Sequence, residues 1–173
     1  SNNGGEVMAK VAVVLAGCGV YDGAEINEAV LTLLSLEQQG ASYQCYAPDI
    51  EQMHVVNHLT GEPVAGETRN VLVEAARIAR GNILDLASLD VGDFDALLVP
   101  GGFGAAKNLC NFAVAGAEMA VHADFLRIAR SFHQAGKPIG LMCIAPVMAT
   151  AICGAGSRCT IGNDAETAAA IEA

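Results

Sequence analysis

Short, unbroken runs of apolar residues, each stopped by glycine, proline or cysteine, constrain the fold of this chain more than any other feature of its sequence. Three of them cover residues 10–16, 95–99 and 137–142. Runs of this length without alternating polar residues are typical of strands buried on both faces, as in a parallel sheet. Because 53% of the 173 residues are hydrophobic and only 16% are charged, the chain can bury such strands in one core.

Amphipathic patterns separate these runs. Helices are predicted for Ala24–Gln39, for Thr68–Ala79 with Thr68 as the N-cap, and for Asp124–Ala135. A further strand is predicted for Tyr43–Ala47, while Asp49–Gly66 shows no clear period and is expected to form a long excursion. Because strands and helices alternate, we expect one α/β domain with a mainly parallel sheet and helices on both faces.

Three loops follow the predicted strands and contain the residues of greatest chemical interest. They are Gly17–Gly23, Gly101–Lys107 and the turn at Cys143. The carboxyl ends of parallel strands lie along one edge of a sheet, and ligands bind in the crevice beyond that edge. We therefore expect these three loops to converge on one candidate site.

Cys143 lies at the end of the last predicted strand, in the segment GLMCIAP. A strand-to-helix turn exposes the side chain at its apex, Pro146 suits the first turn of a following helix, and a helix N-terminus favours a thiolate. A nucleophile elbow has glycines two residues before and after the nucleophile, where this chain has Leu141 and Ala145. The spacing alone therefore supports a nucleophile and an inert buried thiol equally.

Two acidic residues and a glycine cluster are further candidates at this edge. Helix N-termini prefer negative charge, and this preference explains Glu25. For Glu28, spacing alone favours the same explanation over a role as a catalytic acid beside Cys143. The segment PGGFG at residues 100–104 offers either backbone N–H groups for an oxyanion or a turn that needs positive φ. Lys107 either binds a carboxylate or stays solvated.

Other classes of function are disfavoured by simple patterns. Asp22 stands where a dinucleotide fingerprint needs its third glycine, and His54 and His58 have the spacing of a metal pair without a third ligand. The net charge of −10 repels nucleic acid, and no apolar run reaches the roughly 20 residues that span a membrane. The six cysteines form no C-x-x-C pair, which favours reduced thiols and a cytoplasmic location over a metal site or a disulfide framework.

Five segments taken together resemble a known family. They are GVYDGAEINEAVLTLLSL, NHLTGE, ETRNVLVEAARIARGNI, VPGGFGAAKNL and GKPIGLMCIAP. These segments are similar to the glyoxalase ElbB group, also called enhancing lycopene biosynthesis protein, in the PfpI-like class I glutamine amidotransferase superfamily. The resemblance implies a flavodoxin-like three-layer sandwich and a homodimer. It assigns a single domain to residues 8–173, without the last part found in relatives. Residues 1–7 are expected to be a remnant of cloning, because they open with Ser-Asn-Asn-Gly-Gly and precede Met8.

The resemblance also implies an activity and the residues that perform it. The nucleophile of the superfamily falls on Cys143, the paired acid on Glu28, and the oxyanion donors on the backbone N–H groups of Gly102 and Ile144. The group has been assigned the conversion of glyoxal to glycolate, so a small aldehyde is the expected substrate. This chemistry requires neither a metal nor an organic cofactor.

One departure from the superfamily and two alternatives follow from the same residues. Amidotransferases place a histidine after the nucleophile, whereas the last histidine here is His133, which disfavours glutaminase or protease activity through a Cys-His-acid triad. A non-catalytic redox sensor or regulatory protein linked to isoprenoid metabolism would display the same reactive Cys143. A small-anion binding protein would use Gly101–Lys107 without any chemistry.

Overall fold

The computed structural model describes residues 8–154 and 161–162 of the chain. The strands within these residues are β1 (Lys10–Val14), β2 (Ser42–Ala47), β3 (Val56–Asn57), β4 (Glu62–Pro63), β5 (Ile83–Asp85), β6 (Ala96–Val99), β7 (Ile139–Leu141) and β8 (Ile161–Gly162). The α-helices are α1 (Ile26–Gln38), α2 (Val71–Ala79), α3 (Gly104–Lys107), α4 (Phe112–Ala115), α5 (Ala123–Gln134) and α6 (Ala149–Cys153). Short 3-10 helices are η1 (Leu86–Ser88), η2 (Val91–Asp93), η3 (Gly116–Glu118) and η4 (Ala145–Met148).

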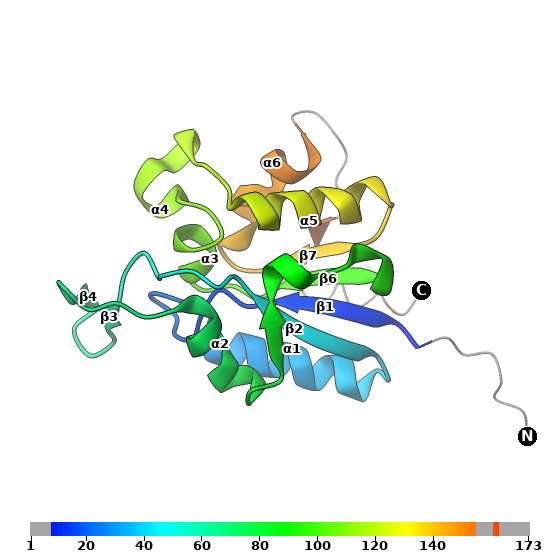
Figure 1. Cartoon of the computed structure of the whole chain (residues 1–173), viewed down its shortest axis with the longest axis horizontal. Coiled ribbons are helices and arrows are strands. Elements are labelled where there is room, and N and C mark those ends of the chain that lie inside the picture. Colours follow the sequence, from blue (N-terminus) through cyan, green and yellow to red (C-terminus); the bar gives the residue numbers. More distant parts are fainter. Residues whose placement is uncertain (1–7, 155–160, 163–173) are drawn as a thin grey trace, which may run out of the picture.

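The main sheet has the strand order β5-β2-β1-β6-β7-β8, and each pair of neighbouring strands in the described residues is parallel. The helices α1 and α2 pack on one face of the sheet, and α5 and α6 pack on the other (Figure 1). The flavodoxin-like α/β sandwich predicted from the sequence is confirmed.

The central strand β1 shows why the apolar runs lack alternation. Val11 and Val13 belong to the core beneath α1 and α2, whereas Ala12 and Val14 belong to the core beneath α5. All four side chains are fully buried. Burial of each valine contributes about 1.5–3 kcal/mol relative to an exposed position, so a polar residue at either kind of position would be costly.

The strand order reverses between β1 and β6, because β2 lies on one side of β1 and β6 lies on the other. Such a reversal opens a crevice at the carboxyl ends of the two strands, where ligands bind in open α/β sheets. The loops after β1 and β6 meet there: Gly104 N–H donates to Gly23 O at 2.9 Å and Glu25 N–H donates to Gly101 O at 2.7 Å. The predicted convergence of these loops is confirmed.

Several element boundaries differ from the prediction. The helix predicted from Thr68 begins at Val71, because Asn70 is its N-cap and accepts a hydrogen bond from Val73 N–H at 2.9 Å. The excursion over residues 49–66 contains the small β3–β4 hairpin, and the edge strand β5 was not predicted. The predicted residues 155–160 and 163–173 of the domain lie outside the described residues.

None of the helices in the described part of the chain has the length and apolar character needed to cross a lipid bilayer.

Candidate active site

Cys143 stands on a sharp turn directly beyond β7. Its side chain is exposed, and its backbone has a φ of 55°, in the left-handed region that residues other than glycine rarely adopt. A strained conformation of this kind costs about 1–3 kcal/mol and clusters at functional sites. The 3-10 helix η4 follows with Pro146 in its first turn, as predicted. The buried position considered for this thiol from the sequence is therefore wrong, and its role as a nucleophile stays a prediction.

Gly101 makes room for this turn from a neighbouring loop. A Cβ atom at Gly101 would overlap the Cβ of Cys143, inside the 3.0 Å limit that real Cβ contacts essentially never cross. The same point lies 2.8 Å from Glu28 Oε1. Leu141 at the usual elbow glycine position is buried in β7, so the glycine that the turn requires is supplied by the loop after β6 instead.

The side chain of Glu28 points at the same spot from the first turn of α1. Its Oε1 accepts a short hydrogen bond from Gly101 N–H. Glu25 is the N-cap of this helix and accepts from the N–H groups of Asn27 and Glu28, which fixes the helix start. Glu25 thus has the capping role expected of it, whereas Glu28 is half-buried and turned towards Gly101 and Cys143.

Two backbone N–H groups are of interest here, one in the loop after β6 and one in the residue that follows Cys143. Within the described residues, no hydrogen-bond acceptor is found for the N–H of Gly102 or of Ile144, the two donors implied by the family resemblance. Gly102 has a φ of 107° and packs so closely on Gly23 that a Cβ atom would overlap the Gly23 carbonyl oxygen. These constraints fix the loop rigidly, and the role of the two N–H groups as oxyanion donors stays a prediction.

Two buried polar side chains that the sequence analysis did not single out as functional hold the loops in place. Asn108 Nδ2 donates to Ala16 O at 2.9 Å and to Asp22 O at 3.0 Å, while its Oδ1 accepts from Met53 N–H. Asp22 Oδ2 accepts from Val56 N–H at 2.8 Å. Asp22, noted only because it breaks a dinucleotide fingerprint, therefore ties the loop after β1 to the excursion over residues 49–66.

The two histidines of this excursion have separate positions. The ring of His58 stacks on Tyr21 with centroids 4.8 Å apart, and its nitrogens lie 3.0 Å from Val56 O and 3.3 Å from Tyr21 N. His54 lines a pocket, and its Nδ1 is buried without a hydrogen-bond partner among the described residues. No cluster of three or more His, Cys, Asp or Glu side chains that could hold a metal is found in that part of the chain.

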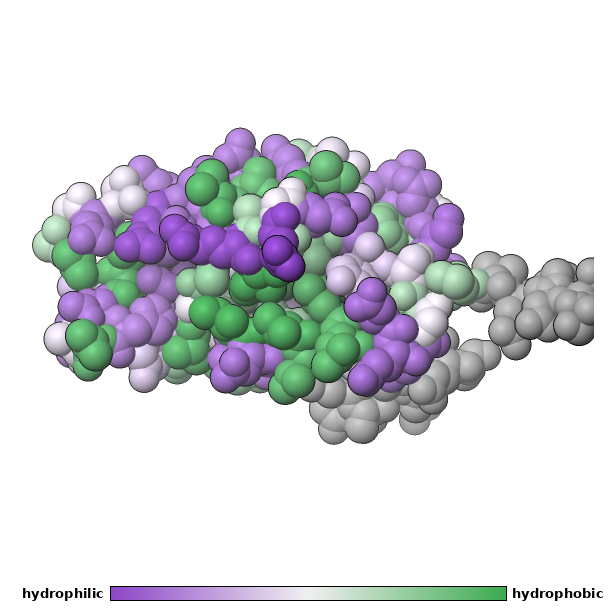
Figure 2. All heavy atoms as spheres, turned by 90° about the horizontal axis from the view of Figure 1, so that it is seen from below, coloured by the Kyte–Doolittle hydropathy of each residue, from purple (hydrophilic) through white to green (hydrophobic). Residues whose placement is uncertain are grey.

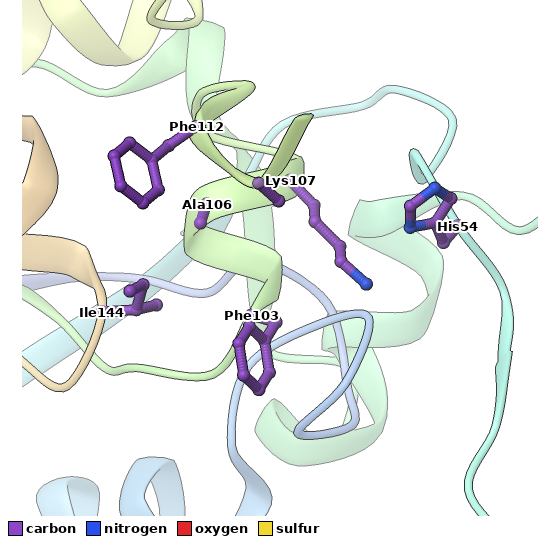
Figure 3. A pocket seen from close by; sticks show the side chains of 7 residues that line it. His54, Phe103, Ala106, Lys107, Phe112 and Ile144 are labelled. Atoms are coloured by element: carbon purple, nitrogen blue, oxygen red, sulfur yellow. The ribbon is translucent and has the colours of Figure 1, made fainter. Parts of the chain in front are cut away.

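A pocket of about 380 Å³ opens beside Ile144, the residue that follows Cys143 (Figure 3). The side chains that Figure 3 labels around it are those of His54, Phe103, Ala106, Lys107, Phe112 and Ile144. Its walls are mostly apolar, and Lys107 extends from α3 with its amine directed between Phe103 and His54. Lys107 Nζ donates to Tyr21 O at 2.7 Å, and burial lowers the pKa of this amine.

The remaining cysteines differ from Cys143 in exposure. Burial raises the pKa of Cys18 and of Cys110, and raises the pKa of Cys45 to about 12. Cys153 is disulfide-bonded, which corrects the expectation that all six cysteines are reduced thiols. A scattered spacing without C-x-x-C pairs did not reveal this bond, because disulfides join residues by proximity in the fold. Cys159 lies outside the described residues.

Alkylation is expected to separate these thiols. At pH 7.5, iodoacetamide should label Cys143 first, because it is exposed while Cys18, Cys45 and Cys110 are more buried and have raised pKa values. A raised pKa keeps a thiol protonated to higher pH, so labelling of these three should increase only as the pH rises further. Peptide mass spectrometry over a pH series measures this order, and labelling of Cys45 as fast as Cys143 would contradict the structure.

No protein-family model matches the chain. The chain is 55% identical over 158 residues to the human protein "Glutamine amidotransferase-like class 1 domain-containing protein 3, mitochondrial". It is 52% identical over 158 residues to "ES1 protein homolog, mitochondrial" of Rattus norvegicus. Each match covers 91% of this chain but 59% of the relative, so the chain spans less than two thirds of their length. Both relatives are named as mitochondrial, whereas the sequence led to the expectation of a cytoplasmic protein.

A solved structure is similar over a larger share of its own length. It is described as an isoprenoid biosynthesis protein with an amidotransferase-like domain from Ehrlichia chaffeensis, and its sequence is 45% identical to this chain. The two superpose with a TM-score of 0.78, covering 83% of this chain and 67% of that chain. A DJ-1 superfamily protein from Salmonella typhimurium shares the fold at 23% identity, with a TM-score of 0.50 and coverage of 84% and 63% of the two chains.

Proposed function

The chain belongs to the class 1 glutamine amidotransferase-like superfamily, and on that premise we propose that it is a glyoxalase-type enzyme with Cys143 as its nucleophile. Its proposed substrates are glyoxal and related small 2-oxoaldehydes, which it converts to hydroxy acids. One observation supports the proposal most strongly: the exposed Cys143 on its strained turn and the Glu28 carboxylate both lie next to Gly101. The absence of a side chain at Gly101 leaves room for both. The finer assignment to the glyoxalase ElbB group is part of this proposal.

The first proposed step is addition of the Cys143 thiolate to one aldehyde carbon of glyoxal. A carbon–sulfur bond forms, and the electron pair of the C=O double bond moves to the oxygen. The N–H groups of Gly102 and Ile144 are the proposed donors to this oxyanion, which then takes a proton to give a hemithioacetal. Because both loops are held by backbone contacts, these donors need little reorganisation during the reaction.

The second proposed step moves a proton between the two carbons of the bound substrate. Glu28 removes the proton from the carbon bonded to sulfur and returns it to the neighbouring carbon. The hydroxyl proton of the hemithioacetal moves to the oxygen of the second carbon, so the first carbon is oxidised to a thioester, the second is reduced to an alcohol, and no external oxidant is needed. Glu28 Oε1 is engaged by Gly101 N–H, while no hydrogen bond to Oε2 is found within the described residues, which favours Oε2 as the base.

Water completes the proposed cycle by hydrolysing the thioester. The carbon–sulfur bond breaks, the Cys143 thiolate is released, and glycolate leaves. Two protons are set free in this step: one replaces the proton that the oxyanion took up in the first step, and the other goes to solvent. The sum of the steps is the addition of one water molecule to glyoxal. No atom or electron is left unbalanced, and the chemistry proceeds through side chains and backbone groups of this chain.

The experiment that tests this proposal follows ¹³C-labelled glyoxal by NMR in D₂O with the purified protein. Formation of ¹³C-glycolate is expected, with deuterium on its CH₂OH carbon to the extent that the Glu28 proton exchanges with solvent. Loss of glyoxal without formation of glycolate, through modification of lysine or arginine side chains for example, would contradict the proposed function.

The redox-sensor alternative is favoured by the same exposed Cys143. Susceptibility of a cysteine to oxidation to sulfenic acid rises with the exposure of its sulfur. Mild peroxide followed by mass spectrometry distinguishes the two functions when it is combined with the glyoxal assay. Selective oxidation of Cys143 in a protein that forms no glycolate would favour sensing over catalysis.

The homodimer implied by the resemblance is also part of the proposal. Helix α1 exposes an apolar stripe at helical spacing, formed by Ile26, Val30, Leu31 and Leu34. Figure 2 shows apolar side chains gathered on the face of the molecule where α1 lies. We place the dimer contact on this stripe, and sedimentation equilibrium measures the oligomeric state.

The cytoplasmic location remains a proposal beside the mitochondrial names of the relatives, and imaging of the tagged full-length protein tests it.

A further inference from the structure

The pocket beside Ile144 contains the amine of Lys107, which forms no salt bridge among the described residues, although the Asp22 carboxylate is near enough to oppose the lowering of its pKa by burial. Within the described residues, no carboxylate oxygen lies within 4.0 Å of Lys107 Nζ, and the salt bridges found there involve arginines instead. One N–H of the ammonium group is used by Tyr21 O, so two donors are left. The centroid of the Phe103 ring lies 6.0 Å from Nζ. A half-buried cation of this kind is stabilised by an anion that enters the pocket.

A second observation points to a polar group in the same pocket. The Nδ1 atom of His54 is buried and has no hydrogen-bond partner among the described residues, although buried polar atoms in proteins are nearly always paired. His54 lies across from the Lys107 amine (Figure 3). One cation together with one imidazole suits a singly charged carboxylate better than a doubly charged phosphate.

The rest of the pocket suits a short carbon chain. Phe112, Ala106 and Ile144 contribute apolar wall, and Ile144 adjoins the nucleophile along the chain. The net charge of −10 gives the protein no general attraction for anions. Recognition of an anion at this place must therefore come from local groups.

Building on the proposed function, we infer that the preferred substrate carries a carboxylate a few carbon atoms from its reacting 2-oxoaldehyde group. Lys107 binds this carboxylate in the pocket while the aldehyde carbon reaches Cys143, and the apolar walls hold the chain between the two ends. Glyoxal itself has neither a chain nor a charge and leaves this pocket empty.

The compound 4,5-dioxopentanoate has the required arrangement, and its methyl ester is a matched neutral probe. The proposed chemistry adds one water to the acid and gives 2-hydroxyglutarate: the aldehyde carbon is oxidised to a carboxylate and the adjacent ketone carbon is reduced to an alcohol. The distal carboxylate takes no part in bond making or breaking. A difference between acid and ester therefore reports on binding of the charge.

The test measures kcat/KM for the acid and for its methyl ester with wild type, Lys107→Gln and Lys137→Gln. Wild type is expected to prefer the acid by about tenfold or more, and Lys107→Gln should bring the ratio close to one. Lys137 is a matched control, because its Nζ donates to Val91 O at 2.8 Å and lies 5.9 Å from the Phe132 ring, at the opposite end of β7. Lys137→Gln should keep the wild-type ratio.

The outcomes separate this inference from the proposed function. Equal turnover of acid and ester by wild type would overturn the inference while the glyoxalase function stands, as would a preference that survives Lys107→Gln. Failure of all 2-oxoaldehydes to react would contradict the proposed function. In that case, calorimetry with the unreactive keto acid 4-oxopentanoate decides whether the pocket binds a carboxylate. Binding that is lost in Lys107→Gln and kept in Lys137→Gln supports the carboxylate site, and absence of binding to wild type overturns it.

Discussion

Replacing Cys143 with alanine is expected to lower kcat/KM for glyoxal by about a thousandfold or more, because covalent addition to the aldehyde then has no nucleophile. The exposed side chain stands outside the core, so its truncation leaves no cavity and the fold should persist. Glycolate formation measured by NMR at saturating and limiting glyoxal gives the two kinetic constants. Circular dichroism of the variant checks that it is folded.

Cys18 provides the matched control for this prediction. It lies in the loop after β1 at the same edge of the sheet, but it is half-buried and burial raises the pKa of its thiol. Cys18→Ala should therefore retain kcat/KM within about twofold of wild type, a margin typical of neutral substitutions. Full activity in Cys143→Ala, or a large loss in Cys18→Ala alone, would assign the chemistry to another group.

Substituting Gly101 with alanine is expected to lower glyoxal turnover by about a hundredfold, even though the change adds only one methyl group. That methyl would overlap Cys143 Cβ and would lie 2.8 Å from Glu28 Oε1, so both side chains must move. A displacement of about 1 Å in a catalytic group is enough for a loss of this size. The same displacement should slow alkylation of Cys143, which can be measured without any substrate.

Gly92→Ala is the control for the general effect of losing a glycine. A Cβ atom there would meet only the Asp90 side chain, at 3.2 Å, and Gly92 lies in η2 away from the crevice. This variant should match wild type in turnover and in alkylation of Cys143. Overpacking by one methyl group costs about 1–3 kcal/mol, so thermal unfolding of both variants shows whether a loss of activity reflects the site or the whole fold. Wild-type turnover in Gly101→Ala would show that Cys143 and Glu28 do not meet over this residue.

The sequence was sufficient for the central part of the architecture, because that part of the fold depends on local patterns. The unbroken runs at residues 10–16, 95–99 and 137–142 predicted β1, β6 and β7, and the convergence of their loops followed from the geometry of parallel sheets. The position of Cys143 at a turn followed from Pro146 and from the end of the apolar run. The exposure of Cys143 and its left-handed backbone could not be predicted, because a cysteine after an apolar strand is as often buried as exposed.

The parts of the site that were missed depend on contacts between distant segments. In the sequence Gly101 is one glycine of a cluster, and its contact with Cys143 joins residues 42 positions apart in the chain. His54 and Lys107 come together at one pocket from the excursion and from α3, which no spacing rule connects. The predicted N-cap at Thr68 failed for a local reason, because Asn70 competes for the same role closer to the first buried residue of α2.

Glycolate formation from glyoxal by wild type, Cys143→Ala, Glu28→Gln and the double variant is the most direct test of a catalytic pair in this crevice. The amide oxygen introduced by Glu28→Gln can still accept from Gly101 N–H, so this change removes the base and preserves the contact. Each single change is expected to reduce kcat/KM by at least about a hundredfold, and the double variant should be no slower than the worse single one, because the two groups serve one reaction path. Wild-type turnover in Glu28→Gln, or losses that simply multiply in the double variant, would contradict the account.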